Sequence, residues 1–177
     1  RWIEVDLVTA RGLPLRMVSA YFHSGQINDP KQDSKMRHLA SIDARVRELF
    51  SRSGEGGPQP RVAGDFNVVR SQRDSKNWKA NYNKTSGVLD EEMAYLNGWV
   101  DAGWCDVVRT LTGPTPGPYS WWSWRGKAFD NDTGWRIDYH YATPGLAGRA
   151  LAARVDRAIS WDTRFSDHAP VVVQFEA

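Results

Sequence analysis

The sequence is poor in cysteine, lacks any long apolar run and carries almost no excess of either charge. Cys105 is the only cysteine in 177 residues, so no disulfide can form within the chain, which favours a cytosolic location over secretion. No apolar stretch approaches the roughly 20 residues that a membrane-spanning helix needs, and no charged-then-apolar leader opens the chain. These absences argue against a disulfide scaffold and a membrane-spanning protein, and they predict a soluble cytoplasmic one.

The charge balance is also unremarkable, with 23 basic and 21 acidic side chains and a net charge of only +2. Domains that bind nucleic acid often carry a stronger basic excess, so composition alone does not predict such a partner. The sequence shows no P-loop, no dinucleotide-binding glycine fingerprint, no HExxH zinc site and no cysteine-rich metal site. Enzymes recognisable by those motifs are therefore not indicated.

Tryptophan, in contrast, is abundant, and every one of the nine except Trp2 lies after residue 77. Each indole buries a large apolar body, and we expect roughly two-thirds of them to be structural. The others are candidates to stack on bases or to line a sugar pocket.

The apolar pattern predicts a layered α/β sandwich, because helices and strands are interleaved and a run of strands follows. Helical spacing predicts helices over 31–50 and 90–100, the second with Asp90 as its N-cap. Residues 70–87 hold few apolar side chains and are expected to form a surface loop. The predicted strands cover 2–7, 15–22, 62–66, 119–124, 135–142, 153–161 and 169–175.

Polar side chains occur at the end of one predicted strand and inside another. Asp65 and Asn67 of the sequence GDFN lie two residues apart, on the same side of an extended chain, although the same residues also favour a turn. Asp138 interrupts an apolar strand, where a carboxylate is costly to bury unless it is paired. Three interpretations of Asp138 are open: its side chain faces outward, it pairs with Arg136, or it orients a histidine.

A third polar group, Asp167-His168, comes just before the last predicted strand. Aspartate can ligate a hard cation, and a histidine oriented by Asp138 can donate to a phosphate oxygen. Phosphodiester cleavage needs an activated water, a cation facing the developing charge and a partner for the leaving oxygen. The three polar groups together supply these functions, so they predict a phosphodiesterase site.

The order of these motifs resembles the endonuclease/exonuclease/phosphatase superfamily. The matching segments are Tyr21, GDFN (64–67), RID (136–138) and SDHAP (166–170). The aromatic segment 119–125, with Phe129-Asp130-Asn131 and Gly134-Trp135 after it, is similar to the exonuclease III / AP endonuclease branch. The resemblance extends over residues 2–176. It implies one domain over 1–177 with a DNase I-like fold, in which helices flank mixed, largely antiparallel sheets.

The resemblance implies a catalytic role for each matching residue. Asp65 would activate or position the attacking water, and Asn67 would help to hold that water and the phosphate. His168, oriented by Asp138, would sit against the scissile phosphate, which the hydroxyl of Tyr21 would also reach.

The resemblance further implies a cation and a DNA-binding surface. Mg²⁺ or Mn²⁺ would bind at Asp167, with Asp65 and Asn67 as further ligands. Arg125 and Lys127 would contact phosphates. The residues expected to surround a base-free sugar or to press on the DNA are Trp124, Phe129, Asn131 and Trp135.

Two departures from the family pattern stand out. The family's Tyr-x-Pro-Asn-Gly segment is replaced by Tyr21-Phe22-His23-Ser24-Gly25. The family's front part, with an Asn after its first strand and a metal-binding Glu after its second, has no counterpart. We therefore expect the chain to be the C-terminal portion of the domain, truncated in front.

The function implied is a DNA repair nuclease that cuts 5′ to abasic sites and removes nucleotides from 3′ ends with Mg²⁺. We expect it to act as a monomer on abasic or nicked double-stranded DNA, associated with the bacterial nucleoid. The alternatives are a less selective DNase, an RNA or phosphoinositide phosphatase of the same superfamily, and a catalytically inactive DNA-binding module.

Overall fold

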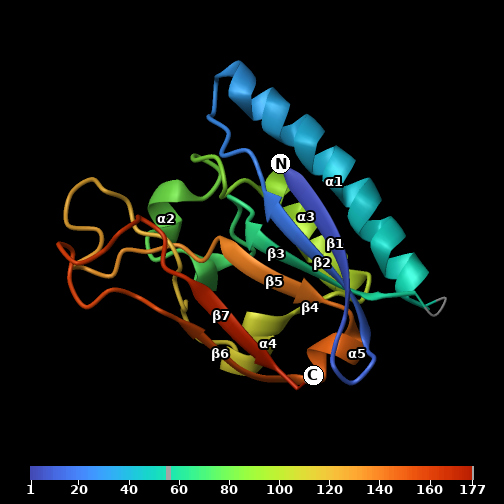
Figure 1. Ribbon diagram of the computed structural model, residues 1–177. Helices are drawn as coiled ribbons and strands as arrows, with labels where there is room; N and C mark the ends of the chain where they lie inside the picture. The colour runs from blue at the N-terminus through green and yellow to red at the C-terminus, as the bar shows by residue number, and fades with distance from the viewer. Residues whose placement is uncertain (55–56, 177) are drawn as a thin grey trace.

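The computed structural model describes residues 1–54 and 57–176 (Figure 1). Its larger sheet has five strands in the order β1-β2-β3-β5-β4. These strands are β1 (Trp2–Val8), β2 (Pro14–Tyr21), β3 (Gln59–Asp65), β5 (Asp138–Ala142) and β4 (Cys105–Asp106). Among the strands of the described ranges, β2 and β3 alone pair in parallel, because the long helix α1 (Pro30–Gly54) carries the chain back between them.

A second sheet pairs β6 (Ala150–Val155) with β7 (Val171–Phe175) in antiparallel fashion. It contacts the larger sheet near β5, where His140 Nε2 lies 3.0 Å from the carbonyl oxygen of Val171. The remaining helices are η1 (Gln72–Asp74), α2 (Trp78–Asn81), α3 (Asp90–Asp101), α4 (Val107–Thr112) and α5 (Pro144–Ala147). None of the helices in the described ranges combines the length and apolarity needed to cross a membrane.

Helix α1 is amphipathic and lies with α3 along one face of the larger sheet (Figure 1). Its buried side chains recur every three or four residues, which places them on a single stripe. This stripe packs against Val18 of β2 and Val62 of β3. The stripe consists of Leu39, Ile42, Val46 and Leu49.

An aromatic stack fills the core beneath the end of β3. Phe66 is fully buried, and its ring stacks on Phe22 with centroids 4.3 Å apart and on Tyr139 with centroids 5.2 Å apart. Trp99 of α3 meets Phe66 edge to face and donates from Nε1 to Asp43 of α1 at 2.8 Å. The stack therefore joins both helices to the strand ends.

The predicted layered α/β fold is confirmed, as are the first two predicted strands and the two predicted helices. The predicted strand over 119–124 is wrong: this segment makes only single bridges, from Trp121 to Trp135 and to His168. No ladder forms because Trp121 pairs with two different segments, each at one residue. The last strands are also shorter than predicted, since β6 ends at Val155.

Two further expectations need correction. Residues 70–87 are not simply a surface loop, because Asp74 and Ser75 are buried and η1 and α2 form within the segment. Asp74 is drawn inward by the buried guanidinium of Arg136. The N-cap of α3 is Leu89 rather than Asp90, which is the first helical residue.

We expect Phe66→Ala to lower the free energy of unfolding by about 3–5 kcal/mol, since it removes a fully buried ring and leaves a cavity in the aromatic stack. Urea denaturation followed by circular dichroism measures this loss. Leu151→Ala, at an exposed position of β6, is the control and should change the free energy by less than about 0.5 kcal/mol. Equal losses for the two variants would contradict the packing described.

Candidate active site

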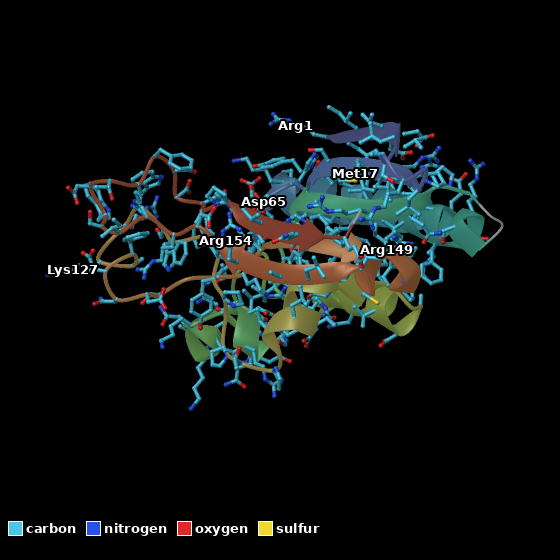
Figure 2. All side chains as sticks on the ribbon, turned by 60° about the horizontal axis from the view of Figure 1, so that its bottom comes forward. Arg1, Met17, Asp65, Lys127, Arg149 and Arg154 are labelled. Carbon is cyan, nitrogen blue, oxygen red and sulfur yellow. The ribbon has the colours of Figure 1, made fainter. Side chains whose placement is uncertain are left out.

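The ends of three adjacent strands bring together most of the residues predicted to be catalytic. Tyr21 ends β2 and is opposite Asp65, the last residue of β3. Asp65 is in turn opposite Asp138, the first residue of β5. Because these strands are neighbours, the side chains meet at one edge of the larger sheet, where Asp65 is labelled in Figure 2.

The GDFN segment turns sharply and holds the Asp65 carboxylate from two directions. Gly64 has φ +142°, and a Cβ there would lie 1.9 Å from the carbonyl oxygen of Ala20, so only glycine fits. Asn67 follows in the left-handed region with φ 50°. Its backbone N–H donates to Asp65 Oδ1 at 2.8 Å, and its Nδ2 donates to Asp65 Oδ2 at 2.9 Å.

His168 lies between the two carboxylates. Its Nδ1 is 2.9 Å from Asp138 Oδ2, and its Nε2 is 3.8 Å from Asp65 Oδ2. The contact expected between His168 and Asp138 is therefore present. With a proton on Nδ1, the imidazole donates to Asp138 and turns Nε2 toward Asp65.

The environment raises the pKa of both Asp65 and His168. Burial raises the pKa of Asp65 to about 6, and the nearby negative charge of Asp138 adds to the effect. Burial alone would lower the pKa of His168, but its hydrogen bond to Asp138 and that residue's charge outweigh burial, so the pKa is raised. A carboxylate whose pKa is raised to about 6 is suited to accept a proton near neutral pH.

The alternative in which Asp138 pairs with Arg136 is wrong. Arg136 is buried, and its Nε donates to Asp74 Oδ1 at 2.6 Å. Its Nη1 and Nη2 donate to the two carboxylate oxygens of Asp106 at 3.0 and 2.8 Å. The donors of Arg136 are therefore taken up by Asp74 and Asp106, and Asp138 pairs with His168 instead.

A buried ion pair lies behind Asn67. Lys35 Nζ is 2.9 Å from Glu92 Oε1, and both side chains are fully enclosed. The same ammonium donates to the carbonyl oxygens of Ser24 at 3.1 Å and Asn67 at 2.8 Å, and to Ser86 Oγ at 3.2 Å. Burial lowers the pKa of Lys35, while Glu92 opposes that shift. One buried cation thus anchors the segment after Tyr21, the GDFN turn and the segment before α3.

A cavity of about 440 Å³ opens beside Asn67. One wall is formed by Trp121, Trp135 and Ile137, with the two indole centroids 5.5 Å apart. Trp121 was not among the residues singled out from the sequence, although its bridge to Trp135 places both rings at this wall. The rest of the lining consists of Ser24, Gly25, Gln26, Ile27, Lys84, Thr85 and Ser86.

The other residues predicted to contact DNA lie apart from this cavity. Trp124, Arg125 and Lys127 are exposed on a loop that projects from the sheets, with Lys127 at its tip in Figure 2. Asn131 is exposed nearby. Phe129 is only 4% exposed and packs against Trp122, so its burial disagrees with the predicted DNA contact.

The three predicted metal ligands offer oxygen donors of the kind that Mg²⁺ prefers. Asp65 is held by Asn67, and Asp167 Oδ2 accepts from Trp121 Nε1 at 2.9 Å. Within the part of the chain that the structure describes, no three His, Cys, Asp or Glu side chains are grouped to hold an ion. The residues fit part of a cation shell, and the assignment of Asp65, Asn67 and Asp167 stays a prediction.

Fold and site together define a DNase I-like α/β protein, and comparison with solved structures agrees. The chain is similar to the 3′ phosphatase NExo from Neisseria, solved bound to a product DNA hairpin. The two are 25% identical with a TM-score of 0.83, and the match covers 98% of this chain and 65% of the other.

The model of the Endonuclease/Exonuclease/phosphatase family matches residues 7–168, so the chain belongs to this family. An exodeoxyribonuclease of Streptococcus pneumoniae is 33% identical over 181 residues, a match that covers 98% of this chain and 63% of that protein. Exodeoxyribonuclease III of Haemophilus influenzae is 30% identical over 185 residues, with coverage of 99% and 67%. The resemblance noted in the sequence is confirmed, and the chain spans about two thirds of the length of these relatives.

Asp138→Asn should lower the pKa of His168, because burial of the imidazole remains while the stabilising negative charge is lost. A pH titration of the histidine Cε1–H signals by NMR measures the shift. His38, whose lowered pKa is caused mainly by burial and the neighbouring His23, is the internal control and should not move. An unchanged His168 titration would show that Asp138 does not govern this imidazole.

Lys35→Met should lower the free energy of unfolding by about 3–5 kcal/mol, since it leaves the carboxylate of Glu92 buried without its cation. Adding Glu92→Gln should restore part of that loss, because the uncompensated charge is then gone. Lys79→Met, at an exposed position, is the matched control. Urea unfolding of the unsubstituted chain and the three variants measures these free energies. If Lys35→Met lowers the free energy of unfolding no more than Lys79→Met does, the anchoring role is ruled out.

Proposed function

We propose that this chain carries the site of a DNA repair nuclease that hydrolyses phosphodiester bonds 5′ to abasic sites and from 3′ ends. The observation that carries the proposal is the alignment of Asp65, His168 and Asp138 beside a cavity walled by tryptophans. The names of the relatives from S. pneumoniae and H. influenzae, and the DNA-bound Neisseria structure, support DNA as the substrate.

In the proposed reaction, Asp65 accepts a proton from the attacking water, and Asn67 holds that water and the phosphate. The hydrogen bonds from Asn67 fix the direction of the carboxylate in advance. His168, with Nδ1 bound to Asp138, presents Nε2 to the phosphate, where its positive charge stabilises the transition state. Tyr21, exposed at the end of β2, reaches the phosphate through its hydroxyl.

A divalent cation, Mg²⁺ or Mn²⁺, would bind at Asp167 with Asp65 and Asn67 and would supply charge neutralisation at the phosphate. Because the described residues provide only part of a shell, further ligands are required. Asp167 is suited to this task, since the hydrogen bond from Trp121 fixes its carboxylate.

The cavity beside Asn67 suits a sugar without its base. A base-free nucleotide is cheap to extrude from the duplex, and a close aromatic wall excludes an intact nucleotide by size. Trp121 and Trp135 would form that wall, while Trp124, Arg125, Lys127 and Asn131 would contact the flanking DNA. We place the reaction at nucleoid DNA in the bacterial cytoplasm, with a monomer on abasic or nicked duplexes.

A catalytically inactive DNA-binding module is the second candidate function. The observation that favours it is the incomplete cation shell within the described ranges. Such a module would bind abasic duplexes but show no turnover at any Mg²⁺ concentration, so a metal titration that follows binding and cleavage together separates it from the nuclease.

For the nuclease, Asp65→Asn and His168→Ala should each reduce cleavage of an abasic duplex by about 10²- to 10⁴-fold in the presence of Mg²⁺, because each removes a proton-transfer or charge-stabilising group. EDTA should abolish cleavage. Asp6→Asn, at an exposed carboxylate of β1, is the control and should cleave at the rate of the unsubstituted chain. Undiminished cleavage by both site variants would show that the assignment is wrong.

A further inference from the structure

Two neighbouring loops expose aromatic side chains that lie outside the cavity beside Asn67. Between β6 and β7, Phe165 is 83% exposed and Trp161 is 47% exposed. On the loop that carries Lys127, Trp124 is 49% exposed. Both loops project on the same side of the molecule, orange and red in Figure 1, and Lys127 marks this side in Figure 2. Exposed aromatic side chains gathered on two loops indicate an interaction surface.

A buried arginine fixes two of these rings in place. The Arg164 guanidinium carbon lies 3.7 Å from the centroid of Trp124 and 5.4 Å from that of Trp161, and the two indoles meet edge to face at 6.2 Å. Arg164 is only 8% exposed, and its Nη1 donates to the carbonyl oxygen of Trp122 at 3.2 Å. Its Nε and Nη2 have no hydrogen-bond partner in the described ranges, so stacking on the rings is their main interaction. We call Trp124, Trp161, Arg164 and Phe165 the aromatic platform.

The aromatic platform is continuous with the site. Phe165 lines a cavity of about 320 Å³ together with Gly64, Asp138 and His168. On the other loop, the backbone N–H of Trp122 donates to the carbonyl oxygen of Asp167 at 2.9 Å. A strand whose phosphate lies at His168 therefore has Phe165 beside it, and the rest of the platform follows on the same two loops.

We propose that the aromatic platform stacks on unpaired bases of the DNA strand that enters the site, an inference that rests on the proposed function. Each base has a flat face that stacks on an aromatic ring whatever its sequence, and arginine adds a cation–π contribution. Bases inside an intact duplex are already stacked, so the platform selects frayed ends and single-stranded overhangs. Rings held by Arg164 before binding lose little conformational freedom on contact.

The charges around the platform favour binding by stacking over binding by bulk electrostatic attraction. Arg125 and Lys127 are exposed and can meet backbone phosphates, while Asp130 and Asp162 are exposed on the same two loops. The acidic side chains offset the basic ones, so stacking has to supply the affinity.

The test compares the affinities of two labelled duplexes, one blunt and one with a short 3′ overhang, by fluorescence anisotropy in EDTA so that no cleavage occurs. Trp161→Ala combined with Phe165→Ala should raise the Kd for the overhang duplex by about 5- to 150-fold, which corresponds to the loss of one stacked base. The preference for overhang over blunt duplex should fall accordingly. Trp161→Phe, which keeps an aromatic ring, should retain most of the preference.

Ile159→Ala is the matched control, because Ile159 is fully exposed on the same loop but has no ring, and this variant should keep the full preference. The proposal is overturned if the double variant keeps the full preference for the overhang duplex. It is also overturned if the unsubstituted chain binds both duplexes equally. If the chain binds neither duplex, the proposed function fails together with the platform. A concentration-dependent dimer on size-exclusion chromatography that the double variant abolishes identifies a second copy as the occupant and also overturns the proposal.

Discussion

The guanidinium of Arg136 lies where three segments that are distant in sequence meet, and the arrangement of the site depends on it. Its donors bind Asp74 from the segment before α2 and Asp106 from the end of β4. Arg70 and Arg109 complete the charge network around the same two carboxylates. A charge buried this deeply has to be fully paired. The pairing fixes the chain on which Trp135 and Asp138 lie, so that Trp135 faces the cavity and Asp138 faces His168.

Lys35 provides a similar constraint at the GDFN turn. Its ammonium bonds to the carbonyl oxygen of Asn67 and pairs with Glu92 of α3, so it ties the GDFN turn to two helices. The carboxylate of Asp65 therefore rests on a framework held by two buried cations, Lys35 and Arg136. Pre-set geometry of this kind is what catalysis by positioned polar groups needs. The aromatic loops, in contrast, project from this framework and are joined to it chiefly next to Asp167.

Much of the site was predictable because its key residues belong to short motifs. Asp65 and Asn67 act on each other within three residues, and Asp167-His168 adjoin, so local sequence was enough to single them out. The wall of the cavity was not predictable in this way. Trp121 is placed at the cavity wall by its bridge to Trp135, while Phe129, equally aromatic, turns inward against Trp122. An aromatic residue looks the same in sequence whether it packs in a core or faces a ligand.

The sequence by itself determined the strands and helices with clear periodicity, the family, and the residue types at the strand ends, because each of these depends on neighbours along the chain. The tertiary structure alone decided which charges pair and which rings remain exposed. Arg136 pairs with Asp74, which is far away in sequence, and not with nearby Asp138. The reason is that a buried guanidinium is stable only where each of its donors finds an acceptor. Arg164 likewise holds Trp124 and Trp161 together across two loops, a contact that the sequence pattern does not predict.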